Sequence, residues 1–181
     1  RILGVLGGGQ LGRMLIQETI SFNQEVYVLD PDANAPCSLL ANKFVQGDFK
    51  DYETVLNFGR QVDVLTIEIE QVNVDALLQL EKDGVSVFPQ PDIIKMIQDK
   101  GLQKQFFLEN NIPTSPFKLI NHESDLLNTE SSWFPCFYKS RKDGYDGKGV
   151  QFIHSKMELE KFPIGTYILE KAIDINMEFA V

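Results

Sequence analysis

Apolar and polar residues alternate in two distinct rhythms along the first half of the chain. Short apolar runs of strand type are separated by stretches in which apolar residues recur every three or four positions, the spacing of a helix that buries one face. These rhythms predict strands at 2–6, 26–29, 44–45, 62–69 and 85–88, and helices at 10–20, 52–61 and 74–82. Strands that alternate with helices in this way favour a parallel sheet with right-handed crossover connections.

The alternation stops at Pro89 and Pro91. Two helices are predicted next, at 92–98 and 102–110, followed by short strands at 117–120, 136–140, 150–153 and 166–171, with helices near 124 and 156–161. We therefore expect an α/β chain with a parallel-sheet domain at 1–97, a small α+β unit at 98–172 and a further element that begins at 173–181. Ile2 already belongs to a strand pattern and 177–181 stop in mid-element, so we expect this chain to be part of a longer protein.

Composition and charge narrow the range of functions. Apolar residues make up 43% of the 181 positions, which is ordinary for a protein with a buried core. Acidic residues outnumber basic ones by 26 to 17, and the resulting net charge of −9 argues against a nucleic-acid surface. An anionic ligand must then be attracted by a local cluster of positive side chains.

Localisation and cysteine chemistry can also be predicted from the sequence. The chain has no apolar run of the roughly 18 residues that a membrane helix needs, and its first residues lack the apolar block of a signal peptide. We therefore expect a cytoplasmic protein that does not bind a membrane. Cys37 and Cys136 are far apart and occur in no metal-binding spacing, so we expect reduced, buried thiols.

The segment 139–149 has the strongest chemical signal in the chain. It follows an apolar stretch and reads Lys-Ser-Arg-Lys-Asp-Gly-Tyr-Asp-Gly-Lys-Gly. Glycines let backbone N–H groups approach anionic oxygens, and Lys139 and Lys148 supply compact positive charge, so the segment favours a lid over phosphate groups. The alternative is a flexible hairpin tip with solvated lysines. The position of Tyr145 and Asp146 between glycines, with Arg141 two residues after Lys139, favours the lid.

A second glycine-rich turn lies near the N-terminus. Residues 7–12, Gly-Gly-Gly-Gln-Leu-Gly, fit the dinucleotide fingerprint G-x-G-x-x-G between a strand and a helix, and Asp30 closes the next strand. Taken alone, this fingerprint favours an NAD-dependent oxidoreductase. Its N–H groups and the positive end of the helix dipole would suit any phosphate, however, so a phosphorylated substrate and a tight turn without a ligand are alternatives.

Polar residues interrupt the strand predicted at 62–69. Thr66, Glu68 and Glu70 alternate with apolar residues, so we expect all three on one face of the strand. That face belongs either to a ligand-binding edge of the sheet or to a solvated edge strand.

Charged residues of the second unit also allow two interpretations. Asp99, Lys100 and Lys104 could lie near nucleotide phosphates, although solvated helix charges are the simpler interpretation. Glu170 and Glu178 could take ribose hydroxyls or lie near adenine, or they could be surface carboxylates.

Together these motifs resemble the ATP-grasp superfamily and, within it, the carboxyaminoimidazole ribonucleotide synthase family of purine biosynthesis. The resemblance spans the whole chain and depends on four strings in the family's order: Gly-Gly-Gly-Gln-Leu-Gly-Arg at 7–13, Thr-x-Glu-x-Glu at 66–70, Gln-Asp-Lys at 98–100 with Lys104, and Lys-x-Arg-x-x-Gly-Tyr-Asp-Gly-Lys-Gly at 139–149. It implies a pre-ATP-grasp substrate domain at 1–97, an ATP-grasp linker and lid subdomain at 98–172, and the start of a C-terminal ATP-grasp subdomain at 173–181.

The resemblance also implies a reaction and its ligands. ATP would activate bicarbonate as carboxyphosphate, which would carboxylate the exocyclic amine of 5-aminoimidazole ribonucleotide in a homodimeric, Mg²⁺-dependent ligase. The family's magnesium ligands are expected beyond Val181, so we expect this chain alone not to turn over.

Site residues follow from the same resemblance. The ATP-binding positions would be Lys100, Lys139, Gly144, Tyr145, Asp146, Gly147, Lys148, Gly149, Val150, Glu170, Lys171, Ala172, Ile173 and Glu178. Tyr145, Asp146 and Lys148 would face the substrate as catalytic residues. The substrate-binding positions would be Gly9, Gln10, Leu11 and Glu70, with the glycine turn near the substrate's phosphate.

The sequence departs from the family pattern at several positions. Lys100 occupies a position where arginine is usual, Ile67 and Ile69 replace frequent aromatics, and Val150 replaces a common glutamine. These departures affect contact detail and leave the reaction class intact. The alternatives are a sibling ATP-grasp ligase of the glycinamide ribonucleotide transformylase or biotin carboxylase type, an NAD-dependent oxidoreductase, and a non-catalytic nucleotide-binding module.

Overall fold

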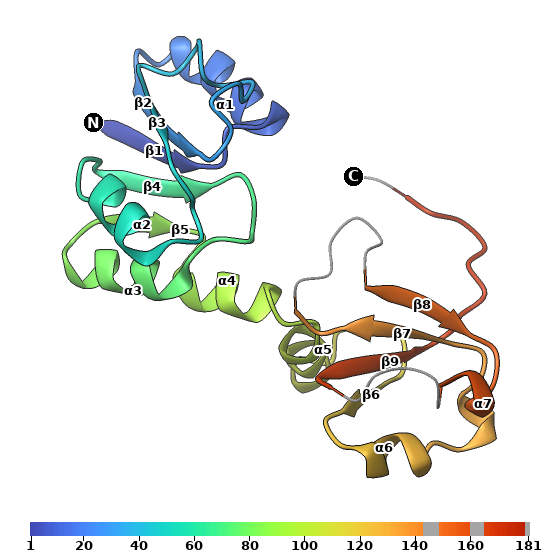
Figure 1. Cartoon of the computed structure of the whole chain (residues 1–181). Coiled ribbons are helices and arrows are strands. Elements are labelled where there is room, and N and C mark those ends of the chain that lie inside the picture. The colour runs from blue at the N-terminus through green and yellow to red at the C-terminus, as the bar shows by residue number, and fades with distance from the viewer. Residues whose placement is uncertain (143–148, 160–164, 180–181) are drawn as a thin grey trace. The chain divides into compact units, whose positions relative to one another are not determined.

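The computed structural model of the chain describes residues 1–142, 149–159 and 165–179. The chain divides into two units, Arg1–Lys95 and Met96–Val181, each with its own sheet (Figure 1). The division falls within helix α4 (Pro91–Ile97), near the boundary after residue 97 that the sequence pattern predicts.

The first unit is built on a parallel sheet with the strand order β3-β2-β1-β4-β5, so the predicted parallel sheet is confirmed. Its strands are β1 (Ile2–Leu6), β2 (Glu25–Asp30), β3 (Lys43–Gln46), β4 (Val64–Ile67) and β5 (Ser86–Phe88), and its helices are α1 (Gln10–Ile20), α2 (Tyr52–Gly59) and α3 (Val74–Lys82). The strand order reverses between β1 and β4. Open sheets of this kind bind ligands beyond the carboxyl ends of their strands at such a point.

Alternating side chains along β1 and β2 divide the core of the first unit into two layers. Val5 and Val28 point to one face of the sheet, where they pack with Ile16 of α1. Leu6 and Leu29 point to the other face and join the larger cluster that α2 and α3 cover (Figure 1). A sheet with helices on both faces must be apolar at successive positions, which explains the unbroken apolar runs in its strands.

Two helices of the first unit begin at side-chain caps, whereas α1 does not. The carboxylate of Asp51 accepts a hydrogen bond from the backbone N–H of Thr54 at 2.8 Å, and the amide oxygen of Asn73 accepts one from Ala76 at 2.9 Å. These bonds satisfy N–H groups that have no partner within the helix. In α1 the N-cap is Gly9, which has no side chain to offer, so the turn before α1 depends on contacts from elsewhere.

The second unit is built on an antiparallel sheet with the strand order β6-β9-β7-β8. Its elements are α5 (Lys100–Glu109), β6 (Phe117–Ile120), α6 (Glu123–Leu127), the 3-10 helix η1 (Ser131–Trp133), β7 (Cys136–Ser140), β8 (Val150–Ile153), α7 (Lys156–Leu159) and β9 (Tyr167–Lys171). This mixture of antiparallel strands and short helices confirms the α+β unit predicted from the sequence.

Successive side chains of the strands in the second sheet point to opposite faces, so only one of the two sets lies outside the core. Tyr138 and Leu169 are paired neighbours on β7 and β9 and point into a core that Leu126 of α6 and Leu159 of α7 complete. The flanking residues of β7 and β9 point to the opposite face, because successive side chains of a strand alternate. That opposite face carries Phe137, Lys139 and Glu170.

The strand predicted at 62–69 is clearly shorter in the structure. β4 begins at Val64 and ends at Ile67, two residues inside the prediction at each end. The N–H of Glu68 still donates to the carbonyl of Leu6 at 2.8 Å, but β1 ends there and the chain turns away at Gly7, whose φ is 98°. β5 also ends opposite Thr66, so β4 has no partner on either side and cannot continue. The prediction that Glu68 and Glu70 belong to this strand is therefore wrong.

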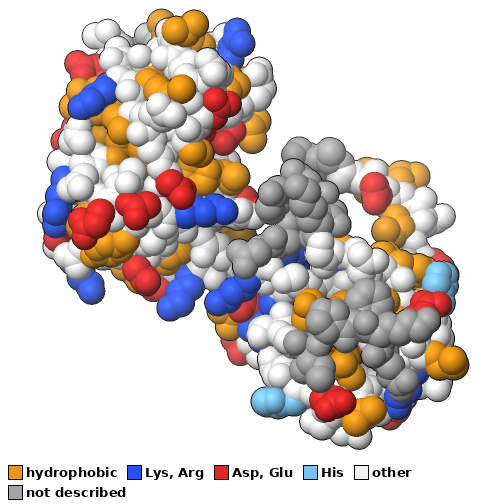
Figure 2. All heavy atoms as spheres, in the orientation of Figure 1, with side chains coloured by type: hydrophobic (Ala, Val, Ile, Leu, Met, Phe, Trp, Pro, Cys, Tyr) orange, Lys and Arg blue, Asp and Glu red, His pale blue; other side chains and the backbone are white. Residues whose placement is uncertain are grey.

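Acidic and basic side chains are interspersed on the face of the first unit that Figure 2 shows.

Among the residues that the structure describes, none of the helices is both long enough and apolar enough to cross a membrane.

Candidate functional site

Two lysines converge on one carboxylate in the second unit. Glu170 of β9 is paired with Phe137 of β7, which brings it beside Lys139 on the same face of the sheet. The Lys139 Nζ donates to Glu170 Oε2 at 3.0 Å, and the Nζ of Lys104, from α5, lies 3.4 Å from the same oxygen. The side chains of Lys104, Lys139 and Glu170 are only 12%, 22% and 13% exposed. The three charges therefore interact in a largely buried setting, where Coulomb energies exceed those at a surface.

Hydroxyl groups from the segment before β6 complete this cluster. The Lys104 Nζ donates to Thr114 Oγ1 at 2.6 Å and to Ser115 Oγ at 2.8 Å. Ser115 in turn donates its hydroxyl to Glu170 Oε2 at 3.2 Å. Thr114 and Ser115 lie between Pro113 and Pro116, whose rings restrict the backbone and help to hold both hydroxyls in place.

Glu170 is held in its ionised form. Burial alone would raise the pKa of its carboxyl, but the hydrogen bond and charge of Lys139, the charge of Lys104 and the hydroxyl of Ser115 together lower that pKa below its ordinary value. Two ammonium groups facing one carboxylate leave a local excess of positive charge in a chain whose net charge is −9. This is the local cluster that an anionic ligand would require.

Aromatic rings border the charged cluster. The Lys139 Nζ lies 5.4 Å from the centre of the Phe137 ring, and the Phe137 and Phe152 rings lie 4.9 Å apart. Phe152, on β8, is 44% exposed and has His154 on its other side at 4.8 Å. Apolar ring surface next to fixed positive charge suits a ligand that joins a flat heterocycle to phosphate groups.

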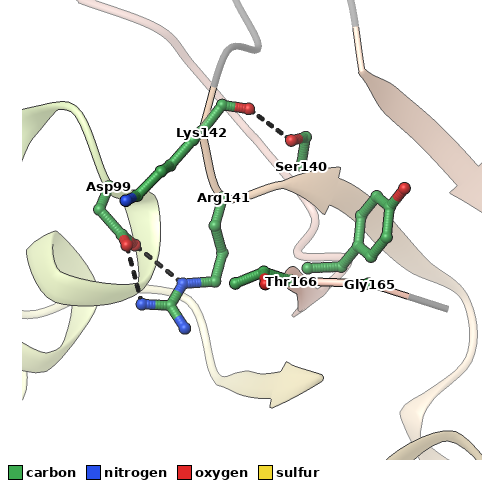
Figure 3. Close-up of a pocket in the computed structure, with 7 residues that line it drawn as sticks. Asp99, Ser140, Arg141, Lys142, Gly165 and Thr166 are labelled. Carbon is green, nitrogen blue, oxygen red and sulfur yellow. Dashed lines mark hydrogen bonds and ion pairs between the residues drawn. The ribbon is translucent and has the colours of Figure 1, made fainter. Parts of the chain in front are cut away.

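A buried ion pair fixes α5 to the end of β7. The guanidinium of Arg141 donates to both carboxylate oxygens of Asp99, at 2.8 Å from Nε and 2.9 Å from the second nitrogen (Figure 3). Asp99 is the N-cap of α5 and also accepts from the backbone N–H groups of Gly101 and Leu102. Lys100 N–H closes the contact by donating to the Arg141 carbonyl at 3.0 Å.

This arrangement requires glycine at position 101. A Cβ atom there would lie 2.4 Å from Nε and 2.7 Å from Cζ of Arg141. Arg141 also lines an open pocket of about 470 Å³, together with Ser140, Lys142 and Thr166 (Figure 3). The interpretation of Asp99 and Lys104 as solvated helix charges is therefore wrong, because Asp99 is 5% exposed and the Lys104 side chain 12% exposed.

Two carboxyls of this unit should make folding sensitive to acid. Burial acts to raise the pKa of Asp99, but hydrogen bonds from Arg141 and from the first turn of α5 lower it on balance, as for Glu170. Their stabilising effect is complete above the ordinary pKa values of 3.8 and 4.5 and is lost as the pH falls through the lower values of the folded chain.

We therefore expect the free energy of unfolding to stay level from neutral pH down to about pH 5 and to decline below it. Urea denaturation at a series of pH values, followed by the fluorescence of the single tryptophan, Trp133, would measure this in the second unit. Asp99→Asn should make the acid decline shallower, because one group with a lowered pKa is removed. An unchanged slope in that variant would contradict the role given to Asp99.

In the first unit, two carboxylates lie against the glycine turn. Asp30, the last residue of β2, accepts a hydrogen bond from Gly8 N–H at 2.7 Å and another from Asp32 N–H at 2.8 Å. Glu68 lies beside the turn, since a Cβ on Gly9 would come within 2.5 Å of its Oε1. Asp30 thus holds the turn that Gly9 cannot cap.

The expected substrate residues lie at the same edge of the first sheet. Gln10 and Leu11 begin α1 and are exposed, and Leu11 is 65% exposed. Glu70 is exposed and follows the end of β4, which is the neighbour of β1. Gly9, Gln10, Leu11 and Glu70 thus lie near the carboxyl ends of β1 and β4, where the strand order reverses.

The expected ATP-binding residues fall into three groups. Lys139 and Glu170 meet, Val150 opens β8 opposite Lys139, Gly149 precedes it with φ 73°, and Lys100 opens α5. Lys171 ends β9 and is exposed, and Ala172, Ile173 and Glu178 follow it in a segment without helix or strand. Gly144, Tyr145, Asp146, Gly147 and Lys148 lie outside the described residues.

Several residues of the cluster were missed from the sequence. Thr114 and Ser115 bind Lys104, and Phe137 and Phe152 supply the aromatic surface. The two hydroxyls between prolines, and the alternation of Phe137 and Lys139 along one strand, were available signals.

Metal ligands are not evident in the part of the chain that the structure describes. Across residues 1–142, 149–159 and 165–179, no three His, Cys, Asp or Glu side chains are grouped so as to hold a metal ion.

Cys37 and Cys136 are free and buried, as the sequence predicts, and burial raises the pKa of the Cys136 thiol to about 11.

Comparison with known proteins gives two family matches. Residues 1–98 match the model of the ribonucleotide synthetase preATP-grasp domain, and residues 105–181 match that of the ATP-grasp domain.

The chain is similar to curated and structurally characterised proteins. N5-carboxyaminoimidazole ribonucleotide synthase of Staphylococcus epidermidis is 35% identical over 161 residues, which cover 88% of this chain and 42% of that protein. The crystal structure of carboxyaminoimidazole ribonucleotide synthase from Aspergillus clavatus complexed with ATP is 33% identical with a TM-score of 0.87, and the match covers 98% of this chain and 48% of that one. The same enzyme in complex with ADP and 5-aminoimidazole ribonucleotide is 31% identical with a TM-score of 0.85, with the same coverage. The chain thus spans less than half the length of these relatives.

Proposed function

Because the chain belongs to the ribonucleotide synthetase preATP-grasp family, we propose that it is part of an ATP-grasp ligase that carboxylates 5-aminoimidazole ribonucleotide with bicarbonate. The relatives named for this reaction support the proposal, as does the bound state of the fungal enzyme with ADP and 5-aminoimidazole ribonucleotide. The protein would then act in purine biosynthesis.

The observation that carries the proposal is the meeting of Lys104, Lys139 and Glu170 beside Phe137 and Phe152. This cluster offers excess positive charge for phosphates and ring surface for a base, in a chain that is acidic elsewhere. We assign Lys139 to the phosphates of ATP. The remaining ATP-binding residues would be Lys100, the segment 144–150, the segment 170–173 and Glu178.

The carboxylation itself requires activation, because bicarbonate is a poor electrophile. Phosphorylation by ATP would supply a leaving group as carboxyphosphate, which must be kept from water until the amine attacks. We propose that the 141–149 segment closes over this site, with Tyr145, Asp146 and Lys148 facing the substrate. Lys139 would neutralise part of the negative charge on the transferring phosphate. Neighbouring residues already hold its ammonium group beside this site, so the contact needs little reorganisation.

The ribonucleotide is proposed to bind at the first unit. The N–H groups of Gln10 and Leu11 in the first turn of α1 have no partner within the helix and would suit its phosphate. Glu70, at the neighbouring strand end, would take a hydrogen-bond donor of the substrate. Exposed apolar residues on and after α1, including Met14 and Phe22, would support a homodimer formed through this unit.

Magnesium would neutralise phosphate charge when bound. The described residues contain no acidic cluster for it, so its ligands are expected outside them.

The affinities for ATP and NADH distinguish this function from the alternative, an NAD-dependent oxidoreductase, which residues 7–12 and Asp30 suggest. We expect the chain to bind ATP and ADP at micromolar concentrations in isothermal titration calorimetry and to bind NADH far more weakly. Micromolar binding of NADH without binding of ATP would reverse the assignment. The use of Asp30 to hold Gly8 already weighs against the oxidoreductase.

An activity measurement tests the reaction in the full-length protein. ADP release with ATP and bicarbonate should be stimulated by 5-aminoimidazole ribonucleotide, and the amine-carboxylated product should accumulate with it. Stimulation by glycinamide ribonucleotide and formate instead would indicate a sibling ligase. Nucleotide binding without ADP release under any of these conditions would indicate a non-catalytic module.

A further inference from the structure

Lys104 and Lys139 share one carboxylate oxygen but are held very differently. An ammonium group has three N–H donors. Those of Lys104 face Thr114 Oγ1 at 2.6 Å, Ser115 Oγ at 2.8 Å and Glu170 Oε2 at 3.4 Å, so its position is fixed by three oxygens. Within the described residues, the Lys139 Nζ donates to a single acceptor, Glu170 Oε2, and its side chain is the more exposed of the two.

This difference in hydrogen bonding determines which of the two lysines can move when an anion approaches the cluster. Lys139 can leave Glu170 for a phosphate oxygen at the loss of one hydrogen bond. Lys104 would have to give up two hydroxyl contacts as well as the carboxylate. If Lys139 were the only cation beside Glu170, its departure would leave a largely buried carboxylate without a counter-charge, which is costly. With Lys104 fixed in place, that carboxylate keeps a cation.

We propose that Lys104 is a positioning residue that retains Glu170 as its counter-ion and thereby releases Lys139 to bind the phosphate groups of the nucleotide. This inference rests on the proposed function, since it assigns Lys139 to ATP, but it concerns a residue that does not itself touch the nucleotide. Ser115 contributes to the same arrangement, because its hydroxyl accepts a hydrogen bond from Lys104 and donates one to Glu170.

The test compares Lys104→Met, Glu170→Gln and the double variant in the full-length protein. In Lys104→Met, Glu170 would hold Lys139 alone, and the dissociation constant for ATP should rise about tenfold or more, the scale of one charge-assisted hydrogen bond. Adding Glu170→Gln removes the charge that retains Lys139, so the double variant should bind ATP better than Lys104→Met does. Equal affinity of Lys104→Met and wild type, or no recovery in the double variant, would overturn the proposal.

Two further measurements separate this role from mere structural support. The carboxyl of Glu170, followed by carbon NMR in the absence of ligand, should have a higher pKa in Lys104→Met, because one of the charges that lower it is lost. Lys118→Met removes an equal charge from β6, where the ammonium lies 4.6 Å from the Trp133 ring, and should leave both ATP affinity and the Glu170 titration unchanged. Should Lys104→Met fail to fold, Ser115→Ala should shift both readouts in the same direction by a smaller amount, and no shift would overturn the proposal.

Inorganic tripolyphosphate distinguishes failure of this inference from failure of the proposed function. If the wild type binds tripolyphosphate but not ATP, the nucleotide assignment is wrong, and the same variants then test the role of Lys104 with tripolyphosphate. If the wild type binds neither, both proposals are overturned.

Discussion

Replacing Lys139 by methionine is expected to lower kcat/KM of the full-length protein by about 30- to 900-fold, which corresponds to the roughly 2–4 kcal/mol of transition-state stabilisation lost when one preorganised donor to a phosphate-like oxygen is removed. The loss should be large because the Lys139 side chain is only 22% exposed and already faces the site, so the contact needs little reorganisation. The fold should survive, since Lys104 and Ser115 still satisfy Glu170 after the substitution.

The kcat/KM of the full-length protein would measure the effect, with isothermal titration of ATP and ADP against the chain as a second readout. Lys118→Met is the matched control, because it removes the same group from a neighbouring strand of the same sheet. Lys139→Met with an affinity within about threefold of the wild type would contradict the assignment of Lys139 to the phosphates.

The local elements of the fold could be predicted from the sequence because their signals are local. α1 and α3 have the predicted bounds, and so do β6, β7 and β8, since apolar spacing and turn residues lie within each segment. The end of β4 could not be predicted in this way. It depends on where its partner β1 turns at Gly7, a property of a segment far away in the sequence.

The candidate site was predictable as a set of residue types but not as an arrangement. The sequence analysis considered Lys104, Lys139 and Glu170 each as a candidate residue of a nucleotide site. Their meeting depends on the register that pairs Phe137 with Glu170 and on the packing of α5 against that face, and neither follows from spacing along the chain. Burial was the hardest property to predict, because Asp99 has the sequence context of an ordinary exposed helix cap.

The burial of Asp99 leads to the largest effect on stability that we expect. Arg141→Ala should lower the free energy of unfolding of the second unit by about 3–5 kcal/mol, because removing one partner of a buried ion pair leaves the other charge without compensation. Arg141 and Asp99 have side chains only 13% and 7% exposed, and both carboxylate oxygens take part in the pair. The substitution also removes the bond from Arg141 to Asn121, at 3.3 Å, which links the segment after β6 to the same point.

Urea denaturation followed by Trp133 fluorescence would report this loss in the second unit. Arg60→Ala is the matched control: Arg60 and Asp83 form a pair of the same residue types at the same 2.8 Å, but in the first unit and with side chains 50% and 28% exposed. Its removal should cost little, because solvent screens exposed pairs, and circular dichroism would follow it. The double variant Arg141→Ala/Asp99→Ala should be more stable than Arg141→Ala alone, since it no longer buries an unpaired carboxylate, although it loses the cap of α5. Equal losses from Arg60→Ala and Arg141→Ala would show that burial of the Asp99 pair contributes nothing, and that α5, with its lysines, is held on the sheet by other contacts.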